Sequence, residues 1–179
     1  MKICIYGAAS NDIDKIYLEC GEKLGKEIAL RNHTLVFGGG ATGLMGAVAR
    51  GVDSNGGALI GIAPRFFDIE GVLYQNCSEL IYTDTMRNRK ELMEEKSDAF
   101  VVTPGGIGTL EEFLEILTLR SLDRHQKPIA LFNINGYFDS LVAFLQNGVE
   151  QKFLRKEDMD LMFICNNEKA ILDYFENYS

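Results

Sequence analysis

Short apolar runs alternate along this chain with longer stretches whose apolar residues recur every three or four positions. A short run bounded by glycine or proline indicates a buried strand, and the longer period indicates an amphipathic helix. The pattern predicts strands over residues 2–7, 34–40, 58–64, 79–83, 98–106, 127–134 and 161–165. It predicts helices over residues 12–32, 43–57, 85–97, 109–122, 136–153 and 167–178, and an irregular segment over 65–78.

This alternation of strand and helix is typical of the α/β class. We expect a Rossmann-like, doubly wound parallel sheet with helices on both faces, formed by residues 1–179 as a single domain. Ligands of such sheets bind outside the carboxyl ends of the strands. Three predicted strands end in glycine there, at Gly7, at Gly38–Gly40 and at Gly105–Gly108, so we expect the binding site at these three turns.

Composition and charge narrow the possible functions. The chain is 46% hydrophobic and 25% charged, which favours a folded core over disorder. Its net charge of -8 argues against a general nucleic-acid partner, although a small phosphorylated ligand stays possible. Four scattered cysteines indicate neither a zinc site nor a disulfide framework. Without a signal peptide or an apolar run of membrane length, we expect a soluble, cytoplasmic protein with no membrane partner.

The first glycine-rich turn, GGGATGLMG, follows the second predicted strand. Gly38, Gly40 and Gly43 match the spacing G-x-G-x-x-G, which lets a backbone approach a phosphate at a helix N-terminus. The acidic residue that would bind the ribose of a nicotinamide dinucleotide has no good counterpart after the third strand. The alternative is a tight turn in which Gly43 and Gly46 permit close helix packing.

The second turn, TPGGIGTLEE, is more specific. Gly105, Gly106 and Gly108 expose backbone N–H groups at a helix start, and Thr109 can cap the helix or donate to a phosphate oxygen. No lysine follows these glycines, so ATP hydrolysis at a Walker A loop is not indicated. Two glutamates, residues 111 and 112, come next. They either complement the helix dipole or require a nearby cation beside a bound phosphate.

That cation is predicted in the segment MRNRK. Arg87, Arg89 and Lys90 lie at the start of a predicted helix, where positive charge is unfavourable for the helix dipole. Such a cluster is either a solvated face or the partner of an anion. An ion pair between Arg89 and Glu112 would keep the glutamate charged while the glycine turn faces a phosphate.

Neither histidine is expected in the site: His33 is expected at the surface and His125 in a solvated or interface loop.

Together these motifs carry a resemblance over nearly the whole chain. The pattern P-G-G-x-G-T-x-x-E, with GGGATGLMG and MRNRK in order, resembles the LOG (Lonely Guy) family of cytokinin-activating phosphoribohydrolases, formerly described as possible lysine decarboxylases. The resemblance implies a Rossmann-like homodimer, without metal or cofactor. It also implies cleavage of a nucleoside 5'-monophosphate, either N6-modified AMP or AMP itself, into free base and D-ribose 5-phosphate.

The same resemblance implies roles for individual residues. Arg89 and Glu112 correspond to the catalytic pair, and Glu112 would stabilise the sugar cation, hold a ribose hydroxyl or activate water. The expected phosphate and substrate contacts are Gly105, Gly106, Ile107, Gly108, Thr109, Lys90, Glu111, Gly39, Gly40, Met86 and Gly7.

Departures from the family pattern concern specificity and dimer details. Arg87 replaces a common histidine, Ala8 and Ala9 replace serines, and Leu119 and Ser121 stand where tryptophan and glutamine are usual.

Alternatives to the phosphoribohydrolase remain at this point. A non-catalytic carrier of a nucleotide or of molybdenum cofactor would keep the glycine turns without needing the Arg–Glu pair. A lysine decarboxylase would need a lysine for pyridoxal phosphate, and Lys90 is the only one near the turns. A nucleotide nucleosidase acting on another base would differ only in its substrate.

Overall fold

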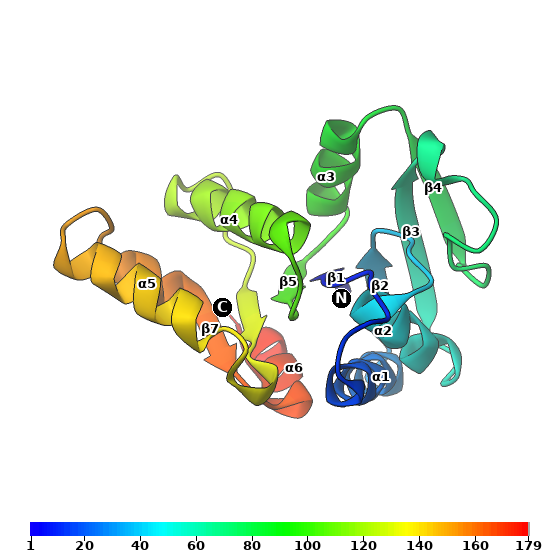
Figure 1. Ribbon diagram of the computed structural model, residues 1–179, viewed down its shortest axis with the longest axis horizontal. Coiled ribbons are helices and arrows are strands. Elements are labelled where there is room, and N and C mark those ends of the chain that lie inside the picture. Colours follow the sequence, from blue (N-terminus) through cyan, green and yellow to red (C-terminus); the bar gives the residue numbers. More distant parts are fainter. Residues whose placement is uncertain (179) are drawn as a thin grey trace.

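The centre of the protein is a seven-stranded sheet, seen in a computed structural model that describes residues 1–178 (Figure 1). The strands are β1 (Lys2–Tyr6), β2 (Thr34–Phe37), β3 (Ala58–Pro64), β4 (Glu79–Thr83), β5 (Ala99–Val102), β6 (Ile129–Phe132) and β7 (Met162–Cys165). They are all parallel, in the order β4-β3-β2-β1-β5-β6-β7. Because both faces of the sheet are covered, β5 and β6 consist entirely of apolar residues, all of them buried.

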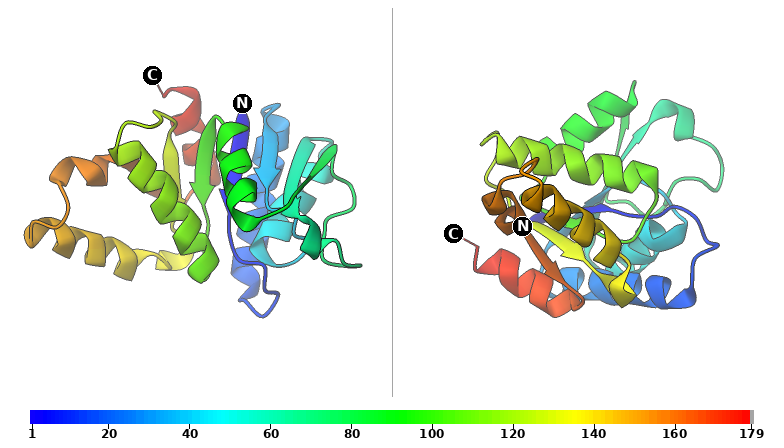
Figure 2. Two further views of the ribbon diagram at one scale, coloured as in Figure 1. Left: turned by 90° about the horizontal axis from the view of Figure 1, so that it is seen from above. Right: turned by 60° about the vertical axis from the view of Figure 1, so that its left-hand side comes forward.

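Helices cover both faces of this sheet (Figures 1 and 2). They are α1 (Lys15–Leu30), α2 (Gly43–Asp53), α3 (Met86–Glu95), α4 (Ile107–Ser121), α5 (Asp139–Glu150) and α6 (Glu168–Glu176), with short 3-10 helices at η1 (Arg65–Phe67), η2 (Ile134–Gly136) and η3 (Lys156–Leu161). Apolar residues of α1, α2 and α6 form one core with the sheet, and those of α3, α4 and α5 form the other. The predicted doubly wound α/β fold is confirmed.

N-cap residues and local backbone conformations determine where the helices begin, and the sequence predicts these positions only in part. Asp14 accepts a hydrogen bond from the Ile16 amide at the start of α1, and Thr85 accepts one from the Asn88 amide at α3. Helix α4 begins at Ile107, two residues earlier than predicted, with Gly106 as its N-cap. Helix α5 begins later than predicted because Asn135 and Gly136 adopt left-handed conformations that a helix excludes.

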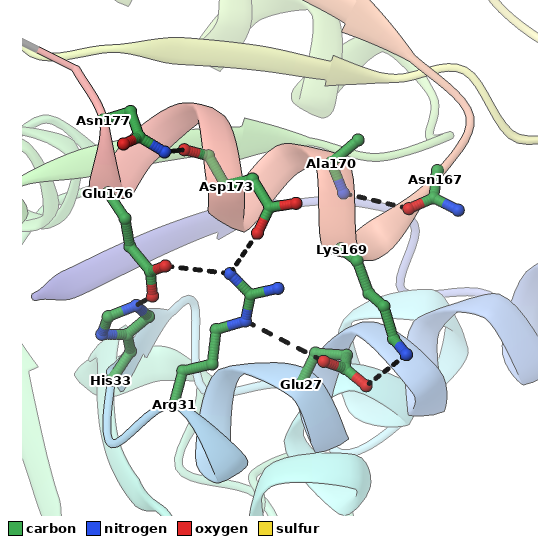
Figure 3. Close-up of polar contacts among 9 residues, drawn as sticks. All are labelled: Glu27, Arg31, His33, Asn167, Lys169, Ala170, Asp173, Glu176 and Asn177. Atoms are coloured by element: carbon green, nitrogen blue, oxygen red, sulfur yellow. Dashed lines mark hydrogen bonds and ion pairs between the residues drawn. The ribbon is translucent and has the colours of Figure 1, made fainter.

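A charge network ties α6 to α1 on the face opposite α4 (Figure 3). The Arg31 Nη1 atom donates to Asp173 Oδ1 at 2.7 Å and to Glu176 Oε2 at 2.9 Å. His33 Nε2 lies 2.9 Å from Glu176 Oε1, so this histidine joins the same network. It is therefore buried, and the expectation that it lies at the surface is wrong.

His125 also differs from its expectation. Its Nε2 atom lies 3.0 Å from the carbonyl oxygen of Ile116, and the ring packs near Phe100 with a centroid separation of 5.7 Å. The residue is buried against β5 and α4. Its hydrogen bond links the connection between α4 and β6 back to α4. His125 is thus a satisfied core histidine and not part of a solvated loop.

The strand order fixes where a ligand can bind. From β1 the chain proceeds to β2, β3 and β4 on one side, and it then crosses to β5 on the other side. The adjacent strands β2, β1 and β5 therefore present their carboxyl ends at the point where the order reverses. Gly38, Gly7 and Thr103 are the residues that follow these three strands, so the glycine-rich turns predicted from the sequence meet in space.

Candidate active site

A cavity of about 560 Å³ opens at this reversal point. Its walls come from the turns after β1, β2 and β5, from the starts of α3 and α4, and from the segment after η1. The lining residues are Gly7, Ala8, Ala9, Gly38, Gly40, Thr42, Met45, Phe67, Gly71, Val72, Leu73, Met86, Arg89, Gly106, Gly108, Thr109, Glu111 and Glu112. A hollow of about 580 Å³ beside Lys156 and a larger one of about 750 Å³ beside Tyr74 are lined by neither Arg89 nor Glu112.

An ion pair between Arg89 and Glu112 lies on one side of this cavity, as the sequence predicts. Arg89 Nη1 is 3.2 Å from Glu112 Oε1, and both residues are more than nine-tenths buried. Arg89 Nε donates a 3.3 Å hydrogen bond to the carbonyl oxygen of Ile62 at the end of β3. A Cβ atom on Gly38 would lie 2.1 Å from Arg89 Nη2, so the first glycine turn provides the space in which this guanidinium rests.

Burial tunes the acidity of the glutamate. Desolvation raises the pKa of Glu112 from 4.5 to about 7, although the adjacent Arg89 and the more distant Lys90 both lower it. Glu111 and Glu115 on the same helix raise the pKa further. A carboxyl that titrates near neutral pH inside a cavity can exchange protons with a bound substrate.

The second glycine turn has two kinds of glycine. A Cβ atom on Gly105 would lie 2.1 Å from Thr109 Oγ1, so that position requires glycine for packing. At Gly106 and Gly108 a Cβ atom would meet nothing within 4 Å, and neither residue has a positive φ. Both line the cavity, where the missing side chains leave the amides of the α4 N-terminus accessible to an anion.

The first glycine turn is explained by the fold itself. Gly43 has a φ of 65°, and a Cβ atom there would lie 2.5 Å from the carbonyl oxygen of Ala8. A Cβ atom on Gly46 would lie 2.1 Å from the carbonyl oxygen of Ala41. These contacts support the alternative of a tight turn with close packing, although Gly38 and Gly40 also line the cavity.

Most of the predicted site residues meet in this cavity. Nine of them line it, namely Gly7, Gly40, Met86, Arg89, Gly106, Gly108, Thr109, Glu111 and Glu112. Four predicted residues lie outside its lining. Gly105 packs on Thr109, Gly39 has a φ of 78° beside Leu73, and Ile107 is 88% exposed.

Lys90 is the fourth, and its ammonium group points elsewhere. It binds Glu111 and lies 2.8 Å from Glu115 Oε2. Burial alone lowers the pKa of Lys90, but the hydrogen bonds to these two carboxylates outweigh that effect and raise it. The lysine therefore stays protonated and links α3 to α4.

Several lining residues were absent from the predicted set. Phe67, Gly71, Val72 and Leu73 belong to the segment that the sequence left irregular. An isolated antiparallel bridge pairs Leu73 with Gly40, and the Ala41 amide donates to the Val72 carbonyl at 3.0 Å. This pairing brings the segment to the wall of the cavity. The available signal was its apolar side chains, which a solvated loop would not need.

Residues 1–178 contain no group of three or more His, Cys, Asp or Glu residues arranged to hold a metal ion. None of their helices combines the length and the apolar character needed to cross a membrane.

Comparison with known proteins identifies relatives over most of the chain. Residues 45–175 match the family model described as "Possible lysine decarboxylase". The chain is 35% identical over 178 residues to a probable cytokinin riboside 5'-monophosphate phosphoribohydrolase of Oryza sativa subsp. japonica, covering 99% of this chain and 73% of the relative. It is 35% identical to a cytokinin riboside 5'-monophosphate phosphoribohydrolase of Arabidopsis thaliana, covering 99% of this chain and 83% of that protein.

Solved structures share the fold at lower identity. The molybdenum cofactor binding protein of Rippkaea orientalis is 23% identical, with a TM-score of 0.73 over 98% of this chain and 94% of that one. The Moco carrier protein of Chlamydomonas reinhardtii is 21% identical, with a TM-score of 0.71 over 98% and 94% of the two chains. At this identity the likeness concerns the fold.

Proposed function

Because the chain belongs to the LOG family of cytokinin riboside 5'-monophosphate phosphoribohydrolases, we propose that it hydrolyses the N-glycosidic bond of adenosine 5'-monophosphates, including N6-modified ones. The products are the free base, adenine or a cytokinin, and D-ribose 5-phosphate. The observation that carries this proposal is the buried Arg89–Glu112 pair, which lies in one cavity with the open amides of Gly106 and Gly108.

The phosphate is assigned to the second glycine turn. Backbone N–H groups at the N-terminus of α4 attract an anion, and Thr109 lines the same wall. Glu111 and Glu112 would repel a phosphate, but Lys90 and Arg89 respectively pair with them. This charge pairing explains how an anion-binding turn can stand directly before two carboxylates. Phosphate binding away from the reacting bond then positions the ribose.

Glu112 is assigned to the reaction centre. As the bond between ribose C1' and the base nitrogen breaks, positive charge develops on the sugar, and a nearby carboxylate stabilises it. The oxygen of a water molecule bonds to C1', and the proton that the water loses passes to Glu112. Glu112 then passes this proton on to the nitrogen of the departing base, which regenerates the carboxylate. A carboxyl with a pKa near 7 is suited to this exchange.

A lysine decarboxylase is disfavoured by the same geometry. Pyridoxal phosphate bonds to a neutral lysine amine, and none of the described residues that line the cavity is a lysine. Lys90 is held protonated between Glu111 and Glu115. The residues present therefore do not fit that cofactor.

The test is a product analysis. Purified protein is incubated with AMP and with isopentenyladenosine 5'-monophosphate, and free base and ribose 5-phosphate are followed by chromatography. Glu112→Gln should lower the rate by roughly 10²- to 10⁴-fold, because it removes the charge without changing the shape. Glu115→Gln is the matched control, since it removes a carboxylate one turn further along α4, outside the cavity.

The outcomes separate the alternatives. Base released by the wild type and lost only in Glu112→Gln supports the proposal, and the relative rates rank the two substrates. Nucleotide that binds but is not cleaved would contradict the enzyme and favour a carrier of the same fold. An equal loss of the cleavage rate in Glu112→Gln and Glu115→Gln would show that Glu112 has no specific role in the reaction.

The proposed assembly is a homodimer. Ile107 and Leu114 lie seven residues apart on one face of α4 and are 88% and 43% exposed, and Leu122 just after the helix is 60% exposed. An exposed apolar row of this kind along α4 is suited to contact with a second copy. Sedimentation equilibrium tests this, since a mass of one chain, 20.0 kDa, would contradict it.

A further inference from the structure

One hydrogen bond joins the second glycine turn to a distant part of the chain. The Tyr137 hydroxyl, which lies between η2 and α5, donates to the carbonyl oxygen of Gly105 at 2.7 Å. The two residues are 32 positions apart in sequence. Tyr137 does not line the cavity, so its hydroxyl contacts the turn without entering the binding space.

The geometry of the peptide unit makes this contact directional. A trans peptide is planar, and its carbonyl and the following N–H point in opposite directions. No peptide bond within residues 1–178 is cis. Fixing the Gly105 carbonyl toward Tyr137 therefore turns the Gly106 N–H the opposite way. Gly106 lines the cavity, and among the described residues its amide has no hydrogen-bond acceptor.

The preceding peptide unit is held in the same manner. The Ala8 amide donates to the carbonyl oxygen of Pro104 at 3.0 Å, so the Gly105 N–H also has a fixed direction. The two successive carbonyls of the turn are thus both occupied by protein donors, one from the turn after β1 and one from Tyr137. A flexible glycine pair would otherwise sample many orientations.

Tyr137 is itself held in place. Asn133 Oδ1 accepts from the Phe138 amide at 2.7 Å, which closes the connection between β6 and α5. The Tyr137 ring packs edge-on against Tyr17, with centroids 6.1 Å apart, and against Phe138 at 5.0 Å. The hydrogen bond beside Tyr137 and the two ring contacts, one from α1 and one from the β6–α5 connection, therefore fix the direction of its hydroxyl group.

From these contacts we propose that Tyr137 is a positioning residue that aims the Gly106 amide at the phosphate of the substrate. This inference rests on the proposed function in so far as the anion is the 5'-phosphate of a nucleotide. Tyr137 itself does not touch the phosphate. It fixes the donor before the ligand arrives, so that binding does not have to order the turn.

The test compares Tyr137→Phe with Tyr17→Phe. Both remove one hydroxyl from rings that contact each other, but within residues 1–178 the Tyr17 hydroxyl makes no hydrogen bond. Calorimetry measures the binding of ribose 5-phosphate, which carries the phosphate, and of adenine, which lacks it. Steady-state kinetics measures KM and kcat with AMP.

Tyr137→Phe should weaken ribose 5-phosphate binding by about three- to tenfold, which corresponds to one ordinary hydrogen bond. Adenine binding should not change, KM for AMP should rise by a similar factor, and kcat should change less. Tyr17→Phe should match the wild type in all these measurements.

Two results would overturn the inference. Unchanged binding of ribose 5-phosphate in Tyr137→Phe would show that the hydroxyl does not aim the amide. An equal loss of adenine binding would show a general structural effect instead of a directional one. If the wild type cleaves no AMP but Tyr137→Phe still selectively weakens ribose 5-phosphate binding, the proposed function fails and the inference about Tyr137 stands.

Discussion

The two glycine-rich turns look alike in sequence but need their glycines for different physical reasons. In the turn after β2, Gly43 has a left-handed backbone, and a Cβ atom on Gly46 would collide with the backbone of Ala41. In the turn after β5, Gly106 and Gly108 have ordinary backbone conformations and empty space where a side chain would be. Folding requires glycine at Gly43 and Gly46, whereas neither a steric contact nor a positive φ requires it at Gly106 and Gly108.

This difference indicates where a ligand binds. A glycine with no packing or backbone requirement lowers stability relative to alanine, because the unfolded chain gains conformational freedom. Leaving the space open is useful when another molecule fills it. Gly106 and Gly108 face the cavity beside Glu112, so a bound anion accounts for them in a way that the fold does not.

The largest effect is expected from alanine in the first turn. Gly46→Ala places a Cβ atom 2.1 Å from the Ala41 carbonyl oxygen, which α2 and the turn cannot both accommodate. We expect the free energy of unfolding to fall by about 3 kcal/mol, measured by urea denaturation monitored by circular dichroism. Gly106→Ala is the matched control from the other turn. A Gly46→Ala protein as stable as that control would remove the contrast between the turns.

A second, intermediate effect concerns the ion pair that lies between the two turns. With the pKa of Glu112 raised to about 7, the ionised form is scarce in mildly acidic solution. If ionised Glu112 is the active form, kcat/KM should fall about tenfold per pH unit below 7 and level off above it. A profile that stays flat down to pH 5 would contradict this role for Glu112.

The same shift predicts how stability changes with pH. The folded protein holds the Glu112 proton more tightly than the unfolded chain, whose carboxyl titrates near 4.5. Its contribution to stability is therefore present below pH 4.5 and is lost as the pH rises through about 7. Relative to Glu112→Gln, the wild type should lose at most roughly 3 kcal/mol between pH 4.5 and 8. Urea denaturation at several pH values measures this difference.

The smallest effect on stability is expected from alanine in the second turn, after β5. Gly108→Ala, inside α4, should leave the free energy of unfolding unchanged or raise it by about 0.5 to 1 kcal/mol. Gly106→Ala should change it by no more than about 1 kcal/mol, because Gly106 is the N-cap of α4, where glycine is favoured over alanine. Each should nevertheless weaken ribose 5-phosphate binding, because a methyl group enters the cavity at the phosphate wall. Thermal denaturation and calorimetry test the two parts separately. A loss of stability without a loss of binding would reverse the assignment of these glycines.

The sequence by itself determined the fold class, and nine of the thirteen residues that it predicts for the site line one cavity. Apolar periodicity predicted all seven strands and the six α-helices of the described residues, since the two periods differ and buried parallel strands are continuously apolar. It did not predict the short 3-10 helices. The glycine turns, and the basic cluster at an unfavourable helix end, predicted which residues would meet. The Arg89–Glu112 pair was predicted from the opposite charges of the two segments, and the burial of both residues makes a partner necessary.

Only the tertiary structure decided the remaining features, since they depend on contacts between distant segments. Lys90 bridges Glu111 and Glu115 because α3 and α4 lie side by side on the sheet. Leu73 reaches the cavity through its pairing with Gly40, and Tyr137 reaches Gly105 across 32 residues. His33 is buried because α6 supplies Glu176. Local sequence sets backbone preference and periodicity, whereas the direction of a side chain is set by what the completed fold packs around it.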